Sequence, residues 1–185
     1  APVLTVPAGT NGSGNYTVSW GEVLHVASYR LEERVNGGSW HLASEGAGRS
    51  KAYSGKANGS YAYRVRASNL SGDGPWSDVA TVTVLHAPAR PTTITVPATS
   101  DASLTVSWSS SSTASTYTLR QSIDGAGYTT VDTVSAHSMN LTLSRSGSYR
   151  YAVKACNAGG CSSYRYSGYV KVTVQPTTYH SLNAP

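Results

Sequence analysis

The chain has 185 residues, which is enough for one ordinary domain or two small ones. Charged residues make up 12% of it, Phe is absent, and the aromatic side chains are mainly 13 Tyr with 4 Trp. Low charge combined with many hydroxyl and aromatic side chains is typical of β-proteins that work outside the cell. No apolar run approaches the roughly 18 residues that a membrane helix needs, so we expect no membrane insertion.

The net charge of +5 is modest for a chain of this length. A positive excess can attract polyanions such as nucleic acid, anionic glycan or lipid headgroups. The alternative, which we favour, is that so small an excess only keeps the protein soluble, and we expect no nucleic-acid partner. Because the chain begins with Ala1 and shows no signal peptide, we expect a processed product or a segment of a longer protein.

An internal repeat divides the chain into two similar halves. The segment Thr-Val-Ser-Trp at 17–20 returns 88 positions later at 105–108, and Gly-Ser-Tyr at 59–61 returns after the same interval. The flanking Thr-Val-Pro and Val-Thr-Val segments return after 90 positions, so the insertions and deletions belong in loops. Such a repeat indicates two copies of one fold. We place the domains at 1–86 and 91–175, a short linker at 87–90, and a tail or the start of a following unit at 176–185.

Apolar and polar residues alternate with a period of two along most of each copy, and no window shows a helical stripe. Asn36-Gly37 lies between two alternating runs, and Asp124-Gly125 takes its place in the second copy. Both pairs are typical of type I′ hairpin turns, which need positive φ at two successive residues. The strands expected in the first copy are 2–7, 15–21, 28–36, 39–45, 50–54, 60–69 and 77–85.

Seven short strands in each copy predict an all-β fold. The chain should form two tandem seven-stranded antiparallel β-sandwiches of immunoglobulin-like architecture. Trp20 and Trp108 fall on the inward side of equivalent strands and should lie in the two cores.

The order of several motifs resembles that of fibronectin type III domains. Each copy has Val-Ser-Trp, then Tyr-x-Leu, then Tyr-x-x-x-Val-x-Ala-x-Asn, and the first copy adds Gly-Pro-Trp-Ser at 74–77. The resemblance covers both copies nearly end to end and is to the bacterial branch, which is found in secreted enzymes and surface proteins. It implies that Tyr61 and Tyr149 are tyrosine-corner residues, whose hydroxyls bond to nearby backbone.

The two cysteines lie five positions apart, in the hairpin between the last two strands of the second copy. The ends of a hairpin lie about 5 Å apart across the ladder, which is within the Cα separation that a disulfide tolerates. We therefore predict a Cys156–Cys161 disulfide and an oxidising compartment, so that the protein is secreted or at the cell surface. A metal site is not expected, because two thiols without a nearby His fall short of four ligands.

No catalytic constellation stands out in the sequence. The five His are scattered over strand, loop and linker positions, and Glu32 and Glu33 are adjacent on one strand. Their side chains must therefore point to opposite faces of the sheet. Phosphate-binding loops, nucleophile elbows and His-Glu-x-x-His motifs do not occur. We expect no enzyme activity, no catalytic residue and no cofactor.

Basic residues on the outward rows of the sheets form one candidate binding surface. In the first copy, the side chain of Glu32 is expected to face solvent beside those of Arg64 and Arg66 on the adjacent strand. The second copy supplies Arg120, Arg150 and Lys154. Such a surface suits an anionic glycan or lipopolysaccharide. The alternative, which we favour, is that Glu32 pairs with arginines across the strands and that charge protects the sheet edges from aggregation.

Aromatic side chains form a second candidate surface, on which sugar rings could stack. They are Trp40, Trp76, Tyr128, Tyr164, Tyr166 and Tyr169. The alternative, which we favour for the tryptophans, is that they cap the edge of the core.

The expected function is that of a non-catalytic spacer or interaction module in a larger secreted or cell-surface bacterial protein. Its partners would be neighbouring domains of the same polypeptide, and a glycan or another protein is a further candidate. Two alternatives stay open. One is an adhesion module that binds carbohydrate or a host protein through loop aromatics and the basic sheet face. The other is a surface or filament subunit that assembles with copies of itself.

Overall fold

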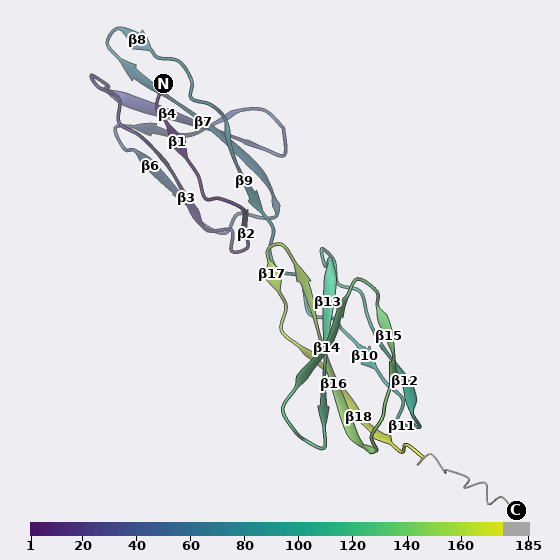
Figure 1. Ribbon diagram of the computed structural model, residues 1–185. Coiled ribbons are helices and arrows are strands. Elements are labelled where there is room, and N and C mark those ends of the chain that lie inside the picture. Colours follow the sequence, from purple (N-terminus) through teal and green to yellow (C-terminus); the bar gives the residue numbers. More distant parts are fainter. Residues whose placement is uncertain (176–185) are drawn as a thin grey trace, which may run out of the picture. The chain divides into compact units, whose positions relative to one another are not determined.

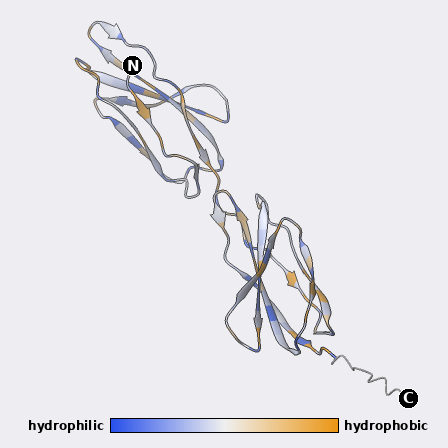
Figure 2. Cartoon of the chain, viewed as in Figure 1, coloured by the Kyte–Doolittle hydropathy of each residue, from blue (hydrophilic) through white to orange (hydrophobic). Residues whose placement is uncertain are grey.

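Strands that alternate buried and exposed side chains build the fold of the computed structural model, which describes residues 1–175 (Figure 1). In β3 (Tyr16–Trp20), for example, the side chains of Tyr16, Val18 and Trp20 are buried and that of Thr17 is exposed. Figure 2 shows the same rule along the strands, with short apolar stretches set among hydrophilic ones. The described residues form no helix, and so none that could cross a membrane.

The first domain is built on Ala1–His86 and holds two sheets. The smaller sheet has the strand order β1-β3-β6, and the larger sheet has the order β2-β9-β7-β4-β5, with β8 paired to β7. Neighbouring strands are antiparallel except for β2 and β9. The strands are β1 (Leu4–Thr5), β2 (Thr10–Asn11), β3 (Tyr16–Trp20), β4 (Ser28–Val35), β5 (His41–Gly46), β6 (Ser50–Tyr53), β7 (Gly59–Asn69), β8 (Gly72–Asp73) and β9 (Ala80–Val84).

The second domain repeats this topology on Ala87–Asn157 and the segment from Cys161. Its smaller sheet is β10-β12-β15, and its larger sheet is β11-β18-β16-β13-β14, with β17 paired to β16. The strands are β10 (Ile94–Thr95), β11 (Thr99–Ser100), β12 (Ser103–Trp108), β13 (Thr116–Ile123), β14 (Thr129–Val134), β15 (Ser138–Thr142), β16 (Gly147–Asn157), β17 (Gly160–Cys161) and β18 (Arg165–Val172).

Two tandem antiparallel sandwiches are therefore confirmed, and each has a strand for all seven predicted from the sequence. The domain ends and the linker at 87–90 stay predictions. The predicted tail, 176–185, lies outside the described residues.

The first strand of each domain differs from the sequence prediction. The pattern predicts one strand at 2–7, and β1 lies within that range, whereas β2 is a further strand that the pattern does not predict and that belongs to the larger sheet. Pro7 lies between them and has no amide hydrogen for a ladder, so pairing stops there. Gly9, with a φ of 72°, then lets the chain turn towards the other sheet. Pro97 occupies the same place between β10 and β11.

One Trp lies at the centre of each core, between the two sheets. Trp20 is 6% exposed and packs against Tyr29 with 5.9 Å between ring centroids, and Trp108 is 5% exposed and packs against Tyr117 at the same distance. The fully buried side chains around them occupy matching positions in the two domains. These are Val18, Leu31, Tyr63, Val65 and Val82 in the first domain, and Val106, Leu119, Tyr151, Val153 and Val170 in the second.

Type I′ turns close the β4–β5 and β13–β14 hairpins, as the sequence predicts. Asn36 and Gly37 have φ values of 51° and 75°, and Asp124 and Gly125 have values of 52° and 77°. The Oδ1 atoms of Asn36 and Asp124 also accept the N–H of the second residue of β7 and of β16, at 2.9 and 2.8 Å. Each turn residue therefore also ties its hairpin to the next strand of the sheet.

The core of the first domain contains a chain of polar side chains that the sequence analysis did not foresee. The hydroxyl of Tyr63 donates to Oε1 of Glu33 at 2.6 Å and lies 2.7 Å from the hydroxyl of Tyr16. Nζ of Lys56 donates to both carboxylate oxygens of Glu33, at 2.7 and 2.8 Å. Burial raises the pKa of Tyr16 to about 12, so its phenol is neutral and can donate at physiological pH.

The second domain lacks the residues that form this polar chain. Leu104 takes the place of Tyr16, Gln121 that of Glu33, and Ser144 that of Lys56. Tyr151 is equivalent to Tyr63, but its buried hydroxyl has no hydrogen-bond partner among the described residues. The same tyrosine is therefore satisfied in one domain and unsatisfied in the other.

This difference gives a matched pair of substitutions. Tyr63→Phe should lower the free energy of unfolding of the first domain by about 1–3 kcal/mol, because it leaves the buried hydroxyl of Tyr16 without its partner and removes one of the hydrogen bonds to Glu33. Tyr151→Phe should change the stability of the second domain little or raise it, because it removes an unsatisfied hydroxyl and no bond. Urea unfolding of both variants checks this, and equal losses in the two domains would contradict it.

Candidate functional site

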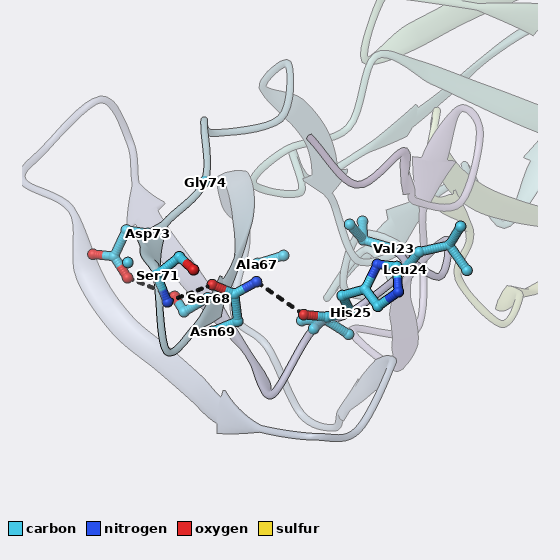
Figure 3. A pocket seen from close by; sticks show the side chains of 11 residues that line it. Val23, Leu24, His25, Ala67, Ser68, Asn69, Ser71, Asp73 and Gly74 are labelled. Carbon is cyan, nitrogen blue, oxygen red and sulfur yellow. Dashed lines mark hydrogen bonds between the residues drawn. The ribbon is translucent and has the colours of Figure 1, made fainter.

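A shallow hollow at the loop end of the first domain holds about 270 Å³ (Figure 3). It lies between the loop that follows β3 and the β7–β8 hairpin. Nδ2 of Asn69 donates to the carbonyl of His25 at 2.9 Å, and Oδ1 of Asn69 accepts the N–H of Ser71 at the same distance (Figure 3). These bonds hold the backbone of His25, whose φ is 59°.

The second domain repeats this brace with different side chains around it. Nδ2 of Asn157 donates to the carbonyl of Thr113 at 3.1 Å, and the φ of Thr113 is 65°. A loop residue held in the left-handed region by an Asn is therefore part of the duplicated fold. The hollow follows from this structural feature, since its hydrogen bonds fix the loops.

The tyrosine-corner residues lie at the start of the longest strand of each domain. The hydroxyl of Tyr61 donates to the carbonyl of Ala57 at 2.9 Å, and that of Tyr149 donates to the carbonyl of Arg145 at 2.9 Å. Both bonds span four residues and tie a crossing loop to the sheet.

A disulfide joins Cys156, at the end of β16, to Cys161 in β17, with 4.0 Å between their Cα atoms. The same two positions of the first domain hold Ser68 and Asp73. There Oγ of Ser68 donates to Oδ1 of Asp73 at 2.6 Å. The duplicated hairpin is therefore closed by a hydrogen bond in one domain and by a covalent bond in the other.

The outer face of the larger sheet in the first domain carries a row of stacked arginines and tryptophans. The guanidinium of Arg64 lies 4.5 Å from the ring centroid of Trp40 and 4.3 Å from that of Trp76. Arg34 lies 4.8 Å from the ring centroid of Trp40, and Arg66 lies 4.7 Å from that of Trp76. Cation–π contacts of this kind fix the side chains over the sheet.

Acidic residues pair with Arg64 and Arg66 of this row, whereas Arg34 has no ion pair among residues 1–175. Glu32 accepts bonds from Arg30 at 3.1 Å and from Arg64 at 2.7 Å, and Asp73 pairs with Arg66 at 2.6 Å. Burial alone would raise the pKa of Glu32, but the hydrogen bonds from Arg64 and Arg30 outweigh it and hold that pKa below its usual value. The expectation that Glu32 faces solvent is wrong: it is 8% exposed, because the arginines cover it.

The same face of the second domain carries cations over tyrosine rings, which we call the cation–tyrosine face. Arg150 lies 5.3 Å from the ring centroids of both Tyr166 and Tyr169, and Lys154 lies 5.4 Å from that of Tyr164. The rings of Tyr166 and Tyr169 are 47% and 60% exposed. The members of the face are Arg120, Arg150, Lys154, Tyr128, Tyr164, Tyr166 and Tyr169.

Backbone carbonyls orient the two arginines of this face. Nη2 of Arg120 donates to the carbonyl of Tyr128 at 3.0 Å, and Nε of Arg150 donates to the carbonyl of Ser167 at 3.1 Å. Burial raises the pKa of Tyr128, and the charge of Arg150 opposes that rise, so the phenol is neutral at physiological pH. In residues 1–175, no acidic side chain lies within 4.0 Å of Arg120, Arg150 or Lys154.

The structure therefore separates the basic residues singled out in the sequence into two groups. Arg64 and Arg66, with Trp76, belong to a stacked row and have acidic partners, whereas Arg120, Arg150 and Lys154 have no acidic partner in the described part of the chain. Sequence reasoning missed Asp73 as the partner of Arg66. The 88-residue interval was an available signal. It makes Asp73 equivalent to Cys161, which places Asp73 across the hairpin from the strand that carries Arg66.

Metal-ligand residues do not gather in the described chain: no group of three His, Cys, Asp or Glu side chains could hold a metal ion there.

The disulfide gives a second prediction. Replacing Cys156 and Cys161 by Ser should lower the free energy of unfolding of the second domain by about 2 kcal/mol or less, because so short a closed loop restricts few unfolded conformations. Urea unfolding followed through the NMR signal of the Trp108 indole, the one Trp of that domain, measures the loss. If the second domain failed to fold without the bridge, the analogy with the Ser68–Asp73 hairpin would be wrong.

Comparison with known proteins agrees with the geometry. Residues 89–182 match the family described as "Chitinase A, N-terminal domain". None of the curated proteins matches the chain in sequence. Among solved structures, domains A168–A170 of titin superpose with a TM-score of 0.61 at 17% identity, covering 95% of this chain and 67% of that one. Domains FN1–FN3 of chicken CNTN1 give 0.50 at 21% identity, covering 93% and 67%. These likenesses show tandem fibronectin type III domains.

Proposed function

Since the chain belongs to the family of the chitinase A N-terminal domain, we propose that it is a non-catalytic fibronectin type III pair within a larger extracellular protein. The observation that carries this proposal is the way both sandwiches use their interiors. In each domain the space between the sheets is filled by one hydrophobic core around one Trp. The packed interiors therefore leave no room for a catalytic cleft between the sheets of either described domain, and a site could lie only on the loops or the outer faces.

The acidic residues support a non-catalytic role. Hydrolysis of a glycosidic bond ordinarily needs two carboxyl groups that face each other across the substrate. Six of the nine acidic side chains lie in ion pairs, among them the adjacent Glu32 and Glu33, which serve opposite faces of β4. The remaining three are Asp78, Asp101 and Asp132.

The disulfide supports an extracellular location. Structural disulfides form and persist in oxidising compartments and are rare in the cytosol of most organisms. The Cys156–Cys161 bridge uses both cysteines of the chain, so no free thiol is left. A secreted or cell-surface module that carries neighbouring domains agrees with this chemistry.

A hydrolysis assay tests the proposal. The purified chain, incubated with chitin oligosaccharides, should release no more reducing ends than a heat-unfolded sample of the same preparation. The physical reason is that the three acidic side chains without an ion pair lie on separate segments of residues 1–175: Asp78 before β9, Asp101 between β11 and β12, and Asp132 in β14. Turnover by the folded chain that is lost in Asp78→Asn, Asp101→Asn or Asp132→Asn would overturn the proposal.

A further inference from the structure

The two domains carry opposite charges at equivalent places on the same sheet face. Glu32, which neutralises Arg30 and Arg64, is replaced after 88 residues by Arg120. Asp73, which neutralises Arg66, is replaced by Cys161. Both acidic residues that balance the face in the first domain are therefore missing from the second.

The cations gained or kept in the second domain are not compensated elsewhere. Arg150 stands where the first domain has Ala62, and Lys154 stands where it has Arg66. All three cations of the cation–tyrosine face are partly buried against rings and strands. A partly buried charge without an opposite charge is unfavourable compared with a paired one, so an anionic ligand on this face would gain that pairing energy.

Donor groups on this face stay available to such a ligand. An arginine has five N–H donors, and the backbone carbonyls of Tyr128 and Ser167 take one from each guanidinium. Nε of Arg120 is buried, so the donors available to a ligand are at the Nη atoms of Arg120 and Arg150. Lys154 makes no hydrogen bond or ion pair within residues 1–175, apart from its contact with the ring of Tyr164. The carbonyls and rings hold the cations in place before a ligand arrives, which lowers the entropic cost of binding.

The rings narrow the chemistry of the ligand. Tyr166 and Tyr169 expose about half of their surface next to the Arg150 guanidinium. A flat aromatic ring beside a cation can cover the apolar face of a sugar while the cation binds a charged group on it. Three cations are few for a phosphate backbone, whose protein partners commonly make about 6–10 phosphate contacts. A polymer of sugar rings that carries fewer charges along its length than a phosphate backbone fits this face better.

We infer that the cation–tyrosine face of the second domain binds an acidic polysaccharide. Arg120, Arg150 and Lys154 bind its carboxylate or sulfate groups, and Tyr166 and Tyr169 pack against its sugar rings. The first domain should bind far more weakly, because Glu32 and Asp73 already pair with Arg64 and Arg66, and of the arginines on its equivalent face only Arg34 is left without an ion pair among residues 1–175. This binding adds to the proposed role as a non-catalytic module and does not depend on it, so either proposal can fail alone.

Binding of the whole chain to four polymers tests the inference, by isothermal titration calorimetry. Polygalacturonate supplies carboxylates, and dextran sulfate supplies sulfates. Dextran is the neutral control, and oligo(dT) is a control polyanion whose charges are backbone phosphates. We expect binding to one or both acidic polysaccharides that weakens as salt rises, since the contacts are partly exposed charges. Which of the two binds identifies the charged group.

Charge-reversed variants locate the site. Arg150→Glu together with Lys154→Glu should weaken binding at least about tenfold, or 1.4 kcal/mol, because each change replaces an attraction by a repulsion. Arg90→Glu, at an exposed position without an ion pair, is the matched control and should leave binding unchanged. Two single variants serve if the double variant does not fold. Lys154→Ala breaks no hydrogen bond, and it should weaken binding several-fold, as should Tyr166→Ala.

Four results would overturn the inference. They are no binding to either acidic polysaccharide, equal binding to dextran, tighter binding to oligo(dT), and affinity that survives the charge-reversed variant while its thermal unfolding is unchanged. The hydrolysis assay described above tests only the proposed non-catalytic role, and its result leaves this inference unchanged.

Discussion

The burial of one indole between two sheets is the constraint on which the rest of this protein depends. Trp20 and Trp108 are nearly inaccessible to water, and the fully buried side chains around them occupy matching positions in the two domains. Burial of large apolar side chains is the main source of stability in small domains, at about 1.5–3 kcal/mol for each. Because these side chains fill both interiors, any specific function must lie on the loops or the outer faces of the sheets.

The two domains share a topology and most of their large buried side chains, while their outer faces differ. One hairpin is closed by a Ser68–Asp73 hydrogen bond and its copy by the Cys156–Cys161 disulfide. The change from Asp to Cys secured the hairpin and also removed an acidic partner from the neighbouring cation. Together with the exchange of Glu32 for Arg120, it leaves one domain with a stacked surface on which Arg64 and Arg66 are paired, and the other with three cations that have no acidic partner among residues 1–175.

The fold was largely predictable from the sequence, and the partners of the charged side chains were not. Strand alternation, the Asn36-Gly37 turn and the repeat are local signals, and the structure agrees with them. Pro7 signalled the break in the first strand but was outweighed by the alternation around it. The inward position of Glu33 also follows from alternation, whereas its bond to Tyr63 depends on the register of β4 with β7 and its bond to Lys56 on the course of the loop between β6 and β7. Such long-range pairs have no signature in a single sequence.

Hydrogen exchange of the indole N–H groups, measured by NMR, tests the central claim most directly. The Nε1 atoms of Trp20 and Trp108 have no hydrogen-bond partner among the described residues, so burial alone must protect them. Both should exchange only through unfolding of their domain, far more slowly than the indoles of Trp40 and Trp76, which lie at the surface. Exchange of either buried indole as fast as those of the surface tryptophans would contradict the two-core architecture and everything inferred from it.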